Sequence, residues 1–251
     1  MTPLSNNEIR KIKSLADKKF RDTFGLFAVE GEKMVDEALE SCFQIEDVYT
    51  AGNVGEKAMS RISSMSSPSP ALAVIRKPAL VELSDNRDVD MCVGDDGLFM
   101  ALDAIRDPGN LGTILRVCDW FGVKAVFASK DTVDVFNPKV VQATMGAIFR
   151  VKFHYVDLDV LFGNIVSKKG RVYGTFLEGK DIYSEDLATG AGSPVAILIG
   201  NESSGISDKA ASLVTDRITI PSFADGGSGS ESLNAAVAAA ITVAEFRRRT
   251  K

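Results

Sequence analysis

The most informative stretch of this chain is Ile197-Leu198-Ile199-Gly200-Asn201-Glu202-Ser203-Ser204-Gly205, an apolar run that stops abruptly at a glycine and two polar residues. A buried strand that gives way to a loop produces this pattern. The pattern recurs at Ile218-Thr219-Ile220-Pro221, and Glu231-Ser232-Leu233-Asn234 then stands at the head of an alanine-rich helix. Two strand ends and a helix start, all with small or polar residues, predict the walls of one ligand pocket.

Strand and helix patterns alternate on both sides of this stretch. We predict strands over residues 98–102, 124–128, 151–155, 171–176, 195–199 and 217–220, and helices over 111–121, from 137, over 158–168 and over 233–249. Such alternation predicts an α/β fold, with a mainly parallel sheet covered by helices on both faces. Ligands of such sheets bind at the carboxyl ends of the strands, where Gly200 and Pro221 lie.

A smaller α/β unit is predicted in the N-terminal part of the chain. Its strands are expected at residues 26–30, 45–50 and 72–75, and its helices at 6–16, 32–41 and 56–63. Ser5 and Glu8 have the spacing of a capping box, which marks the first helix start. Residues 77–97 show little periodicity and several Asp and Asn, so we predict a linker there. The predicted domains are residues 1–90 and 91–251.

Composition limits the possible functions. The net charge of −5 over 251 residues argues against generic adhesion to nucleic acid, although basic clusters at residues 10–21 and 247–251 leave room for local patches. Each cluster could equally be a solvated helix face or a complement to a helix dipole. Three scattered cysteines predict reduced thiols in a cytoplasmic protein. Neither a membrane span nor a signal peptide is expected, hence no membrane partner.

The sequence lacks the residues that several common kinds of functional site require. The glycines at 200 and 205 have phosphate-loop spacing, but Ile206 stands where the lysine is required. The glycine run at 226–229 does not match a dinucleotide fingerprint. The single histidine, His154, leaves no material for a multi-histidine metal site or for histidine acid–base catalysis. No serine nucleophile elbow occurs, and no metal is expected.

Three blocks in order resemble the SpoU (TrmH-like) branch of the SPOUT RNA methyltransferases. They are Asp107-Pro108-Gly109-Asn110-Leu111-Gly112-Thr113-Ile114-Leu115-Arg116, then Ile199 to Ile206, then Ile218 to Pro221 with Glu231 to Ala238. Together they cover about residues 98 to 251. The stretch from Phe20-Arg21 to Phe27-Ala28-Val29-Glu30-Gly31 resembles an L7Ae-like substrate-binding domain often attached to this family.

The resemblance implies a SPOUT fold with a C-terminal trefoil knot, an exception to unknotted topology. It further implies S-adenosylmethionine as cofactor, bound in the knot, a homodimer, and a product with a 2′-O-methylated ribose in rRNA or tRNA. The extra N-terminal domain favours rRNA. Two alternatives stay open: an RNA-binding or ribosome-assembly protein of the same fold without turnover, and a small-molecule α/β enzyme.

The resemblance also assigns residues. The catalytic candidates are Arg116, Asn110, Glu202, Ser232 and Asn234, and the cofactor-binding candidates are Thr175, Ile199, Gly200, Asn201, Ile220, Pro221, Ser232 and Leu233. Because a guanidinium stays protonated, we expect Arg116 to clamp phosphate and stabilise alkoxide charge rather than act as a base.

Some assignments have structural alternatives. Asn110 or Ser232 could be a helix N-cap, and Glu202 could be a solvated loop acid. The glycine-rich loop at 224–229 is longer than the family pattern, which affects the expected shape of the cofactor pocket.

Overall fold

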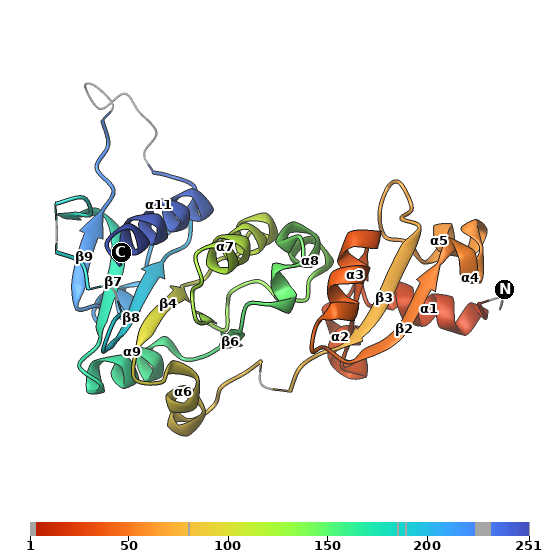
Figure 1. Ribbon diagram of the computed structural model, residues 1–251, viewed down its shortest axis with the longest axis horizontal. Helices are drawn as coiled ribbons and strands as arrows, with labels where there is room; N and C mark the ends of the chain where they lie inside the picture. Colours follow the sequence, from red (N-terminus) through yellow and green to blue (C-terminus); the bar gives the residue numbers. More distant parts are fainter. Residues whose placement is uncertain (1–3, 80, 185, 189, 224–231, 251) are drawn as a thin grey trace. The chain divides into compact units, whose positions relative to one another are not determined.

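The computed structural model describes residues 4–79, 81–184, 186–188, 190–223 and 232–250, and it divides into two compact units (Figure 1). One unit comprises Met1–Ala79 with Asp134–Arg150, and the other comprises Leu80–Val133 with Val151–Lys251. The first unit therefore takes up a segment from the middle of the chain. The sequence patterns did not predict that residues 134–150 belong to the first unit, because hydrophobic periodicity reports only local structure.

The second unit is built on a six-stranded sheet. Its strands are β4 (Gly97–Leu102), β5 (Val126–Ala128), β6 (Phe153–Tyr155), β7 (Arg171–Asp181), β8 (Pro194–Ile199) and β9 (Asp216–Thr219). Their order is β6-β5-β4-β8-β7-β9, and all five neighbouring pairs are parallel. The predicted α/β fold with a mainly parallel sheet is thus confirmed.

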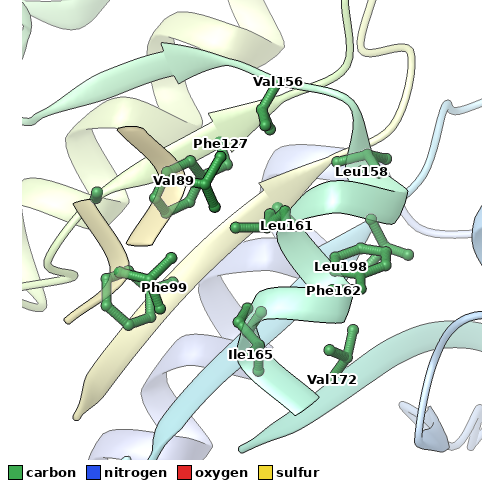
Figure 2. Packing of buried hydrophobic residues seen from close by; sticks show 14 of the residues in the cluster. Val89, Phe99, Phe127, Val156, Leu158, Leu161, Phe162, Ile165, Val172 and Leu198 are labelled. Carbon is green, nitrogen blue, oxygen red and sulfur yellow. The ribbon is translucent and has the colours of Figure 1, made fainter. Parts of the chain in front are cut away.

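Helices cover both faces of this sheet. On one face, α6 (Asn86–Val93), α9 (Leu158–Ser167) and α10 (Asp208–Ala211) contribute to a cluster of buried apolar residues, part of which Figure 2 shows. On the other face lie α7 (Pro108–Trp120) and α11 (Ala235–Arg248). Successive strand residues point to opposite faces. Accordingly Val172 joins the first cluster, while the ring of Tyr173 packs edge-on against Phe246 of α11.

Helix α6 lies within the stretch predicted as a linker, so that prediction was wrong for residues 86–93. Asp85 caps the helix by accepting hydrogen bonds from the backbone of Arg87 and Asp88. Val89 and Val93 are buried in the core, and Cys92 packs against it. The apolar residues of this short helix also include the exposed Met91, so their spacing does not mark one helical face.

Helices α7 and α11 run side by side in the same direction and are joined at both ends. At their starts, Asn234 Nδ2 donates to Asn110 Oδ1 over 2.9 Å. At their ends, Arg247 donates to the carbonyl oxygens of Phe121 and Gly122. An arginine at the end of a helix both satisfies open carbonyls and complements the dipole.

The other arginines of the C-terminal cluster also have structural partners. Arg248 and Arg249 donate to Glu245. These contacts lower the pKa of the Glu245 carboxyl to about 2, and the hydrogen bonds from Arg248 are the largest cause. Arg249 also donates to the carbonyl oxygens of Ile182 and Tyr183. The three arginines of this cluster therefore stabilise the fold. The sequence had left this structural role open beside a patch for nucleic acid.

The first unit contains a three-stranded antiparallel sheet. Its strands β1 (Leu26–Glu30), β2 (Ile45–Thr50) and β3 (Ala71–Arg76) lie in the order β1-β3-β2. Helices α1 (Asn6–Ser14) and α5 (Glu56–Ile62) share a core with this sheet. Helix α3 (Glu32–Glu40) follows β1 as predicted, and the predicted capping box at Ser5 and Glu8 is present.

The remaining short elements were not all predicted. Helices α2 (Lys18–Phe24) and α4 (Ala51–Val54) were missed, whereas α8 (Pro138–Thr144) begins at the expected Asn137 cap and is followed by the 3-10 turn η1 (Ala147–Phe149). Elements of four to seven residues present only one apolar turn, which the hydrophobic period cannot resolve.

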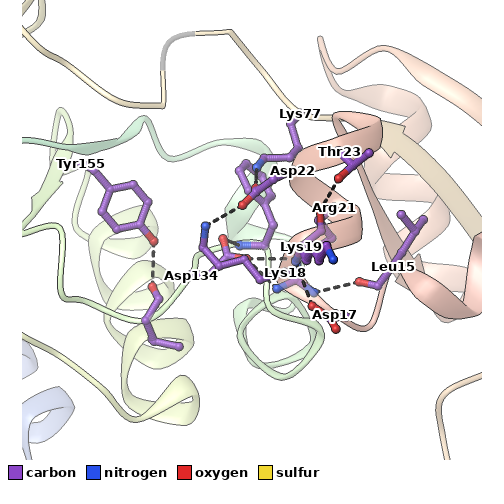
Figure 3. Close-up of polar contacts among 12 residues, drawn as sticks. Leu15, Asp17, Lys18, Lys19, Arg21, Asp22, Thr23, Lys77, Asp134 and Tyr155 are labelled. Carbon is purple, nitrogen blue, oxygen red and sulfur yellow. Dashed lines mark hydrogen bonds and ion pairs between the residues drawn. The ribbon is translucent and has the colours of Figure 1, made fainter.

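A buried ion pair holds the 134–150 segment within the first unit (Figure 3). The Arg21 side chain is 2% exposed, and its Nη2 lies 2.6 Å from Asp134 Oδ2. Its Nη1 donates to the carbonyl oxygens of Leu15 and Ala16, each over 2.8 Å. The guanidinium is thus fully engaged, so this member of the N-terminal basic cluster has a structural role.

Removal of the Arg21 guanidinium should strongly destabilise the first unit. Arg21→Ala leaves the carboxylate of Asp134 in a largely buried site without its cation, which costs about 3–5 kcal/mol. Arg76→Ala is the matched control, because Arg76 pairs with Glu46 at the surface and such pairs contribute about 1 kcal/mol or less. Urea unfolding of both variants measures the difference, and equal losses would contradict the structural role of Arg21.

Candidate functional site

The predicted site residues gather at one edge of the parallel sheet of the second unit. Gly200 follows the carboxyl end of β8, and Ile220 and Pro221 follow the carboxyl end of β9. Helix α7 begins a few residues after β4, and α11 begins after Asn234. Because parallel strands end at the same edge, these four chain segments converge there.

A chain of hydrogen bonds joins the three motifs. Asn110 Nδ2, in the first turn of α7, donates to Glu202 Oε1 in the loop after β8. Asn234 Nδ2 donates to Asn110 Oδ1, and Asn234 Oδ1 accepts from the backbone of Ala236 and Val237. Glu202, Asn110 and Asn234 come from segments as far as 124 residues apart, yet each side chain fixes the next.

The N-caps of α7 and α11 are not Asn110 and Ser232, the residues that the sequence analysis named as possible caps. Asp107, not Asn110, caps α7, since its Oδ1 accepts from the backbone of Asn110 over 2.8 Å. Asn234, not Ser232, caps α11. The predicted start of this helix at residue 233 was two residues too early, because Asn234 is the cap and α11 begins at Ala235. The amide of Asn110 is therefore free of capping and holds Glu202 instead.

The loop between Gly200 and Gly205 is shaped by Asn201. The backbone of Asn201 exchanges two hydrogen bonds with Gly205, and its Oδ1 accepts from the backbone of Ser203 and Ser204. Its Nδ2 donates to the carbonyl oxygen of Ala104. A Cβ on Gly200 would lie 2.4 Å from the backbone of Gly205, so only glycine fits. We infer that Asn201 shapes the loop rather than contacting a ligand through its side chain.

Several backbone groups at this edge are open to a ligand. The backbones of Gly200, Ile220 and Leu233 make no hydrogen bond to any residue in the described part of the chain. Thr175 lies beside them on β7 and donates to the carbonyl oxygen of Leu198 over 3.1 Å. Ile199 is buried in the sheet. The predicted long loop at 224–229 lies outside the described residues.

Arg116 and Ser232 are not joined to the hydrogen-bonded chain. Arg116 is exposed on α7, about 9 Å along the helix axis from Asn110 at 1.5 Å per residue. It forms no hydrogen bond or ion pair with a described residue. Its helix face also carries Thr113 and Trp120, at spacings of three and four residues. An arginine without a protein partner is available to an external anion.

Asp103 is a polar residue of this edge that sequence reasoning missed. It follows β4 directly, is only 6% exposed, and its Oδ2 accepts from the backbone of Ser207 over 2.7 Å. The available signal was an acid immediately after an apolar strand. Asp103 also lines a cavity of about 250 Å³, with Ser129 and Lys209 among its walls, which contains none of the predicted site residues.

The described residues contain no group of three or more side chains arranged to hold a metal ion. Among the helices of the described part, none combines the length and apolar character needed to cross a bilayer.

Two family models together match almost the whole chain. The model of the SpoU rRNA Methylase family matches residues 97–244, and that of the MRM3-like substrate binding domain matches residues 6–94. The chain is 30% identical to the 23S rRNA (guanosine(2553)-2′-O)-methyltransferase RlmP of Bacillus subtilis, over 96% of each chain. It is 26% identical to the mitochondrial rRNA methyltransferase 3A of Danio rerio, over 98% of this chain and 69% of the relative.

Solved structures resemble the chain over its full length. A putative RNA methyltransferase of the TrmH family from Porphyromonas gingivalis superposes with a TM-score of 0.86 and 35% identity, over 99% of this chain and 100% of the other. An AdoMet-bound rRNA methyltransferase from Sinorhizobium meliloti gives a TM-score of 0.82 and 27% identity, over 100% of this chain and 98% of the other.

The tight loop after β8 leads to a test of its glycine. We expect Gly200→Ala to lower stability by about 1–3 kcal/mol, because the new methyl group would force the backbone apart. Gly163→Ala in α9 is the control, since a Cβ there meets nothing within 4 Å and alanine favours a helix by about 0.5–1 kcal/mol. Thermal unfolding of both variants measures these opposite effects. A stable Gly200→Ala variant would show that the loop is not closely packed.

Proposed function

The chain belongs to the SpoU rRNA methylase family, and from this membership we propose that it methylates a ribose 2′-hydroxyl in ribosomal RNA. It is an RNA methyltransferase with S-adenosylmethionine as cofactor. The observation that carries the proposal is the chain of hydrogen bonds from Glu202 through Asn110 to Asn234, which assembles all three motifs at one sheet edge. An RNA-binding protein without turnover would not require this assembly.

The relatives favour ribosomal RNA over transfer RNA. The Bacillus subtilis relative, which matches nearly end to end, is named for a guanosine of 23S rRNA, and the Danio rerio relative is named an rRNA methyltransferase. We assign residues 1–90 to an RNA substrate-binding domain and residues 91–251 to the methyltransferase domain. This division follows the two family models and differs from the two compact units, in which residues 80–90 belong with the methyltransferase sheet. A cytoplasmic location is part of the same proposal.

The open backbone groups fit the cofactor. The backbones of Gly200, Ile220 and Leu233 offer donors and acceptors that have no partner among the described residues, as an adenine ring and an amino-acid group require. We place Thr175, Ile199, Pro221 and Ser232 around them, and we place the site in a C-terminal trefoil knot. Bound S-adenosylmethionine supplies an activated methyl group. The chain contributes a fixed pocket in which the acceptor hydroxyl meets that methyl group in line.

The polar side chains of the site have different proposed roles. Arg116 holds a phosphate of the RNA and stabilises the negative charge that develops on the ribose oxygen, since its guanidinium stays protonated. Glu202 lies near the N-terminal ends of α7 and α11 and orients Asn110, which in turn orients Asn234. Ser232 precedes the α11 cap and is exposed. The proton of the ribose hydroxyl passes to solvent water as the methyl group is transferred, and Arg116 is the residue that offsets the negative charge on the ribose oxygen.

We propose a homodimer built on the exposed face of α7 and α11. Trp120 is 85% exposed at the end of α7, and Val237 is 47% exposed in the first turn of α11. Ile241 and Ala244 continue the apolar stripe along α11 at helical spacing. Large exposed apolar residues on adjacent helices are typical of an interface. Arg116 lies on the same face of α7, so the active site would lie near the contact.

Methyl transfer should depend on Arg116. With purified protein, labelled S-adenosylmethionine and 23S rRNA fragments, we expect 2′-O-methylated nucleosides after digestion. Arg116→Ala should reduce the rate about 100-fold or more, because removal of one stabiliser of oxyanion charge has this effect. Cofactor binding by calorimetry and thermal stability should remain unchanged.

The control is Arg87→Ala, which removes an exposed arginine from α6 on the opposite face of the sheet. Its activity should equal that of the unchanged protein. Full activity of Arg116→Ala would remove the proposed catalytic role, and the absence of any methylated nucleoside with the unchanged protein would refute the proposed reaction.

The homodimer makes a separate prediction. Trp120→Glu places a charge in the proposed interface, so sedimentation should show a shift from dimer to monomer. Met91→Glu introduces the same charge at an exposed residue of α6 and should leave the dimer intact. A monomeric unchanged protein, or a dimer that tolerates Trp120→Glu, would contradict this interface.

A further inference from the structure

Two phenylalanines form an exposed aromatic surface on α2 of the first unit. Phe20 and Phe24 lie one helical turn apart and are each 38% exposed. Their ring centroids are 6.2 Å apart with an angle of 21° between the planes, so the two rings are nearly parallel. Lys11 of α1 places its Nζ 5.7 Å from the centroid of the Phe24 ring. Two helices thus supply flat rings and a cation to one surface.

The acids of the two helices that form this surface are engaged within the fold. Glu8 closes the capping box of α1, and Asp17 caps α2. Asp22 forms ion pairs with Lys18 and Lys77. The acids of α1 and α2 therefore serve the fold and leave little negative charge for a ligand to oppose.

Four basic residues of the same two helices have no such partner. Arg10, Lys11, Lys13 and Lys19 are exposed and form no ion pair with a residue in the described ranges. Lys11 lies over the Phe24 ring, Lys19 precedes Phe20 on α2, and Arg10 and Lys13 add positive charge on α1. The protein as a whole carries a net charge of −5, so this local excess of cations is not a consequence of overall composition.

We propose that this surface, formed by Phe20 and Phe24 with Lys11 and Lys19, binds an unpaired segment of the RNA substrate. Aromatic rings bind unpaired bases by stacking, and lysines hold the phosphates between them. Paired bases in a helix cannot reach the rings, so the surface selects single-stranded RNA. The inference rests on the proposed function only in that RNA is the substrate.

Charge favours RNA over a protein partner. An apolar protein partner would gain nothing from four basic side chains without ion pairs. RNA is a polyanion with flat bases, so it can bind both the basic side chains and the two rings. RNA affinity should therefore fall with salt, and it should fall again when the rings lose their aromatic character.

The test uses the full-length protein and a single-stranded oligouridine that carries one 2-aminopurine. Binding should quench the fluorescence of the purine, because stacking on a ring does so. Phe20→Leu and Phe24→Leu keep an apolar side chain but remove the ring, and each should weaken binding about tenfold and reduce the quenching. Lys11→Gln should lower the slope of log affinity against log salt by about one. A fully paired hairpin should bind more weakly.

Leu39→Ala is the control, since Leu39 is an exposed apolar residue of α3 in the same unit. It should change neither affinity nor quenching. Unchanged binding and quenching in both leucine variants would overturn the proposal, as would a change in oligomeric state in place of a change in RNA affinity. Cofactor binding by calorimetry is measured in parallel. Ring-dependent RNA binding without methyl transfer would refute the enzymatic proposal and support this surface.

Discussion

The site depends on one chain of side-chain hydrogen bonds, from Glu202 through Asn110 to Asn234. Each of these residues belongs to a different motif and to a different segment of the chain. Asn110 can take part only because Asp107 caps α7 in its place. Asn234 adds the cap of α11 to its contact with Asn110. One set of contacts therefore fixes both helix starts and the loop after β8 together.

This arrangement explains why the site lies at the carboxyl edge of the sheet. Parallel strands bring their ends and the following helix starts to one edge, where backbone amides and positive dipole ends are concentrated. Helices on both faces bury the sheet and leave that edge as the place where polar groups can remain open. A carboxylate such as Glu202 is favoured there by the two adjacent helix starts. The fold thus supplies much of the electrostatics of the site through backbone amides and helix starts.

The sequence predicted the regular parts of the fold well. The bounds predicted for β1 and β2 match the structure, and the three motifs converge as expected, since strand ends carry clear local signals. Helix α6 was missed because its few apolar residues, which include the exposed Met91, do not mark one helical face. The inclusion of residues 134–150 in the first unit was not predicted, because it depends on long-range contacts, such as Arg21 with Asp134, which leave no local pattern. The partners of Asn110 could likewise be found only in three dimensions.

The central claim is that this chain methylates a ribose in ribosomal RNA. The most direct measurement maps 2′-O-methylated riboses in the ribosomal RNA of cells that contain the protein and of cells that lack it. The account predicts that a specific methylated ribose disappears without the protein and returns when the protein is restored. An identical set of methylated riboses in both kinds of cell would contradict it.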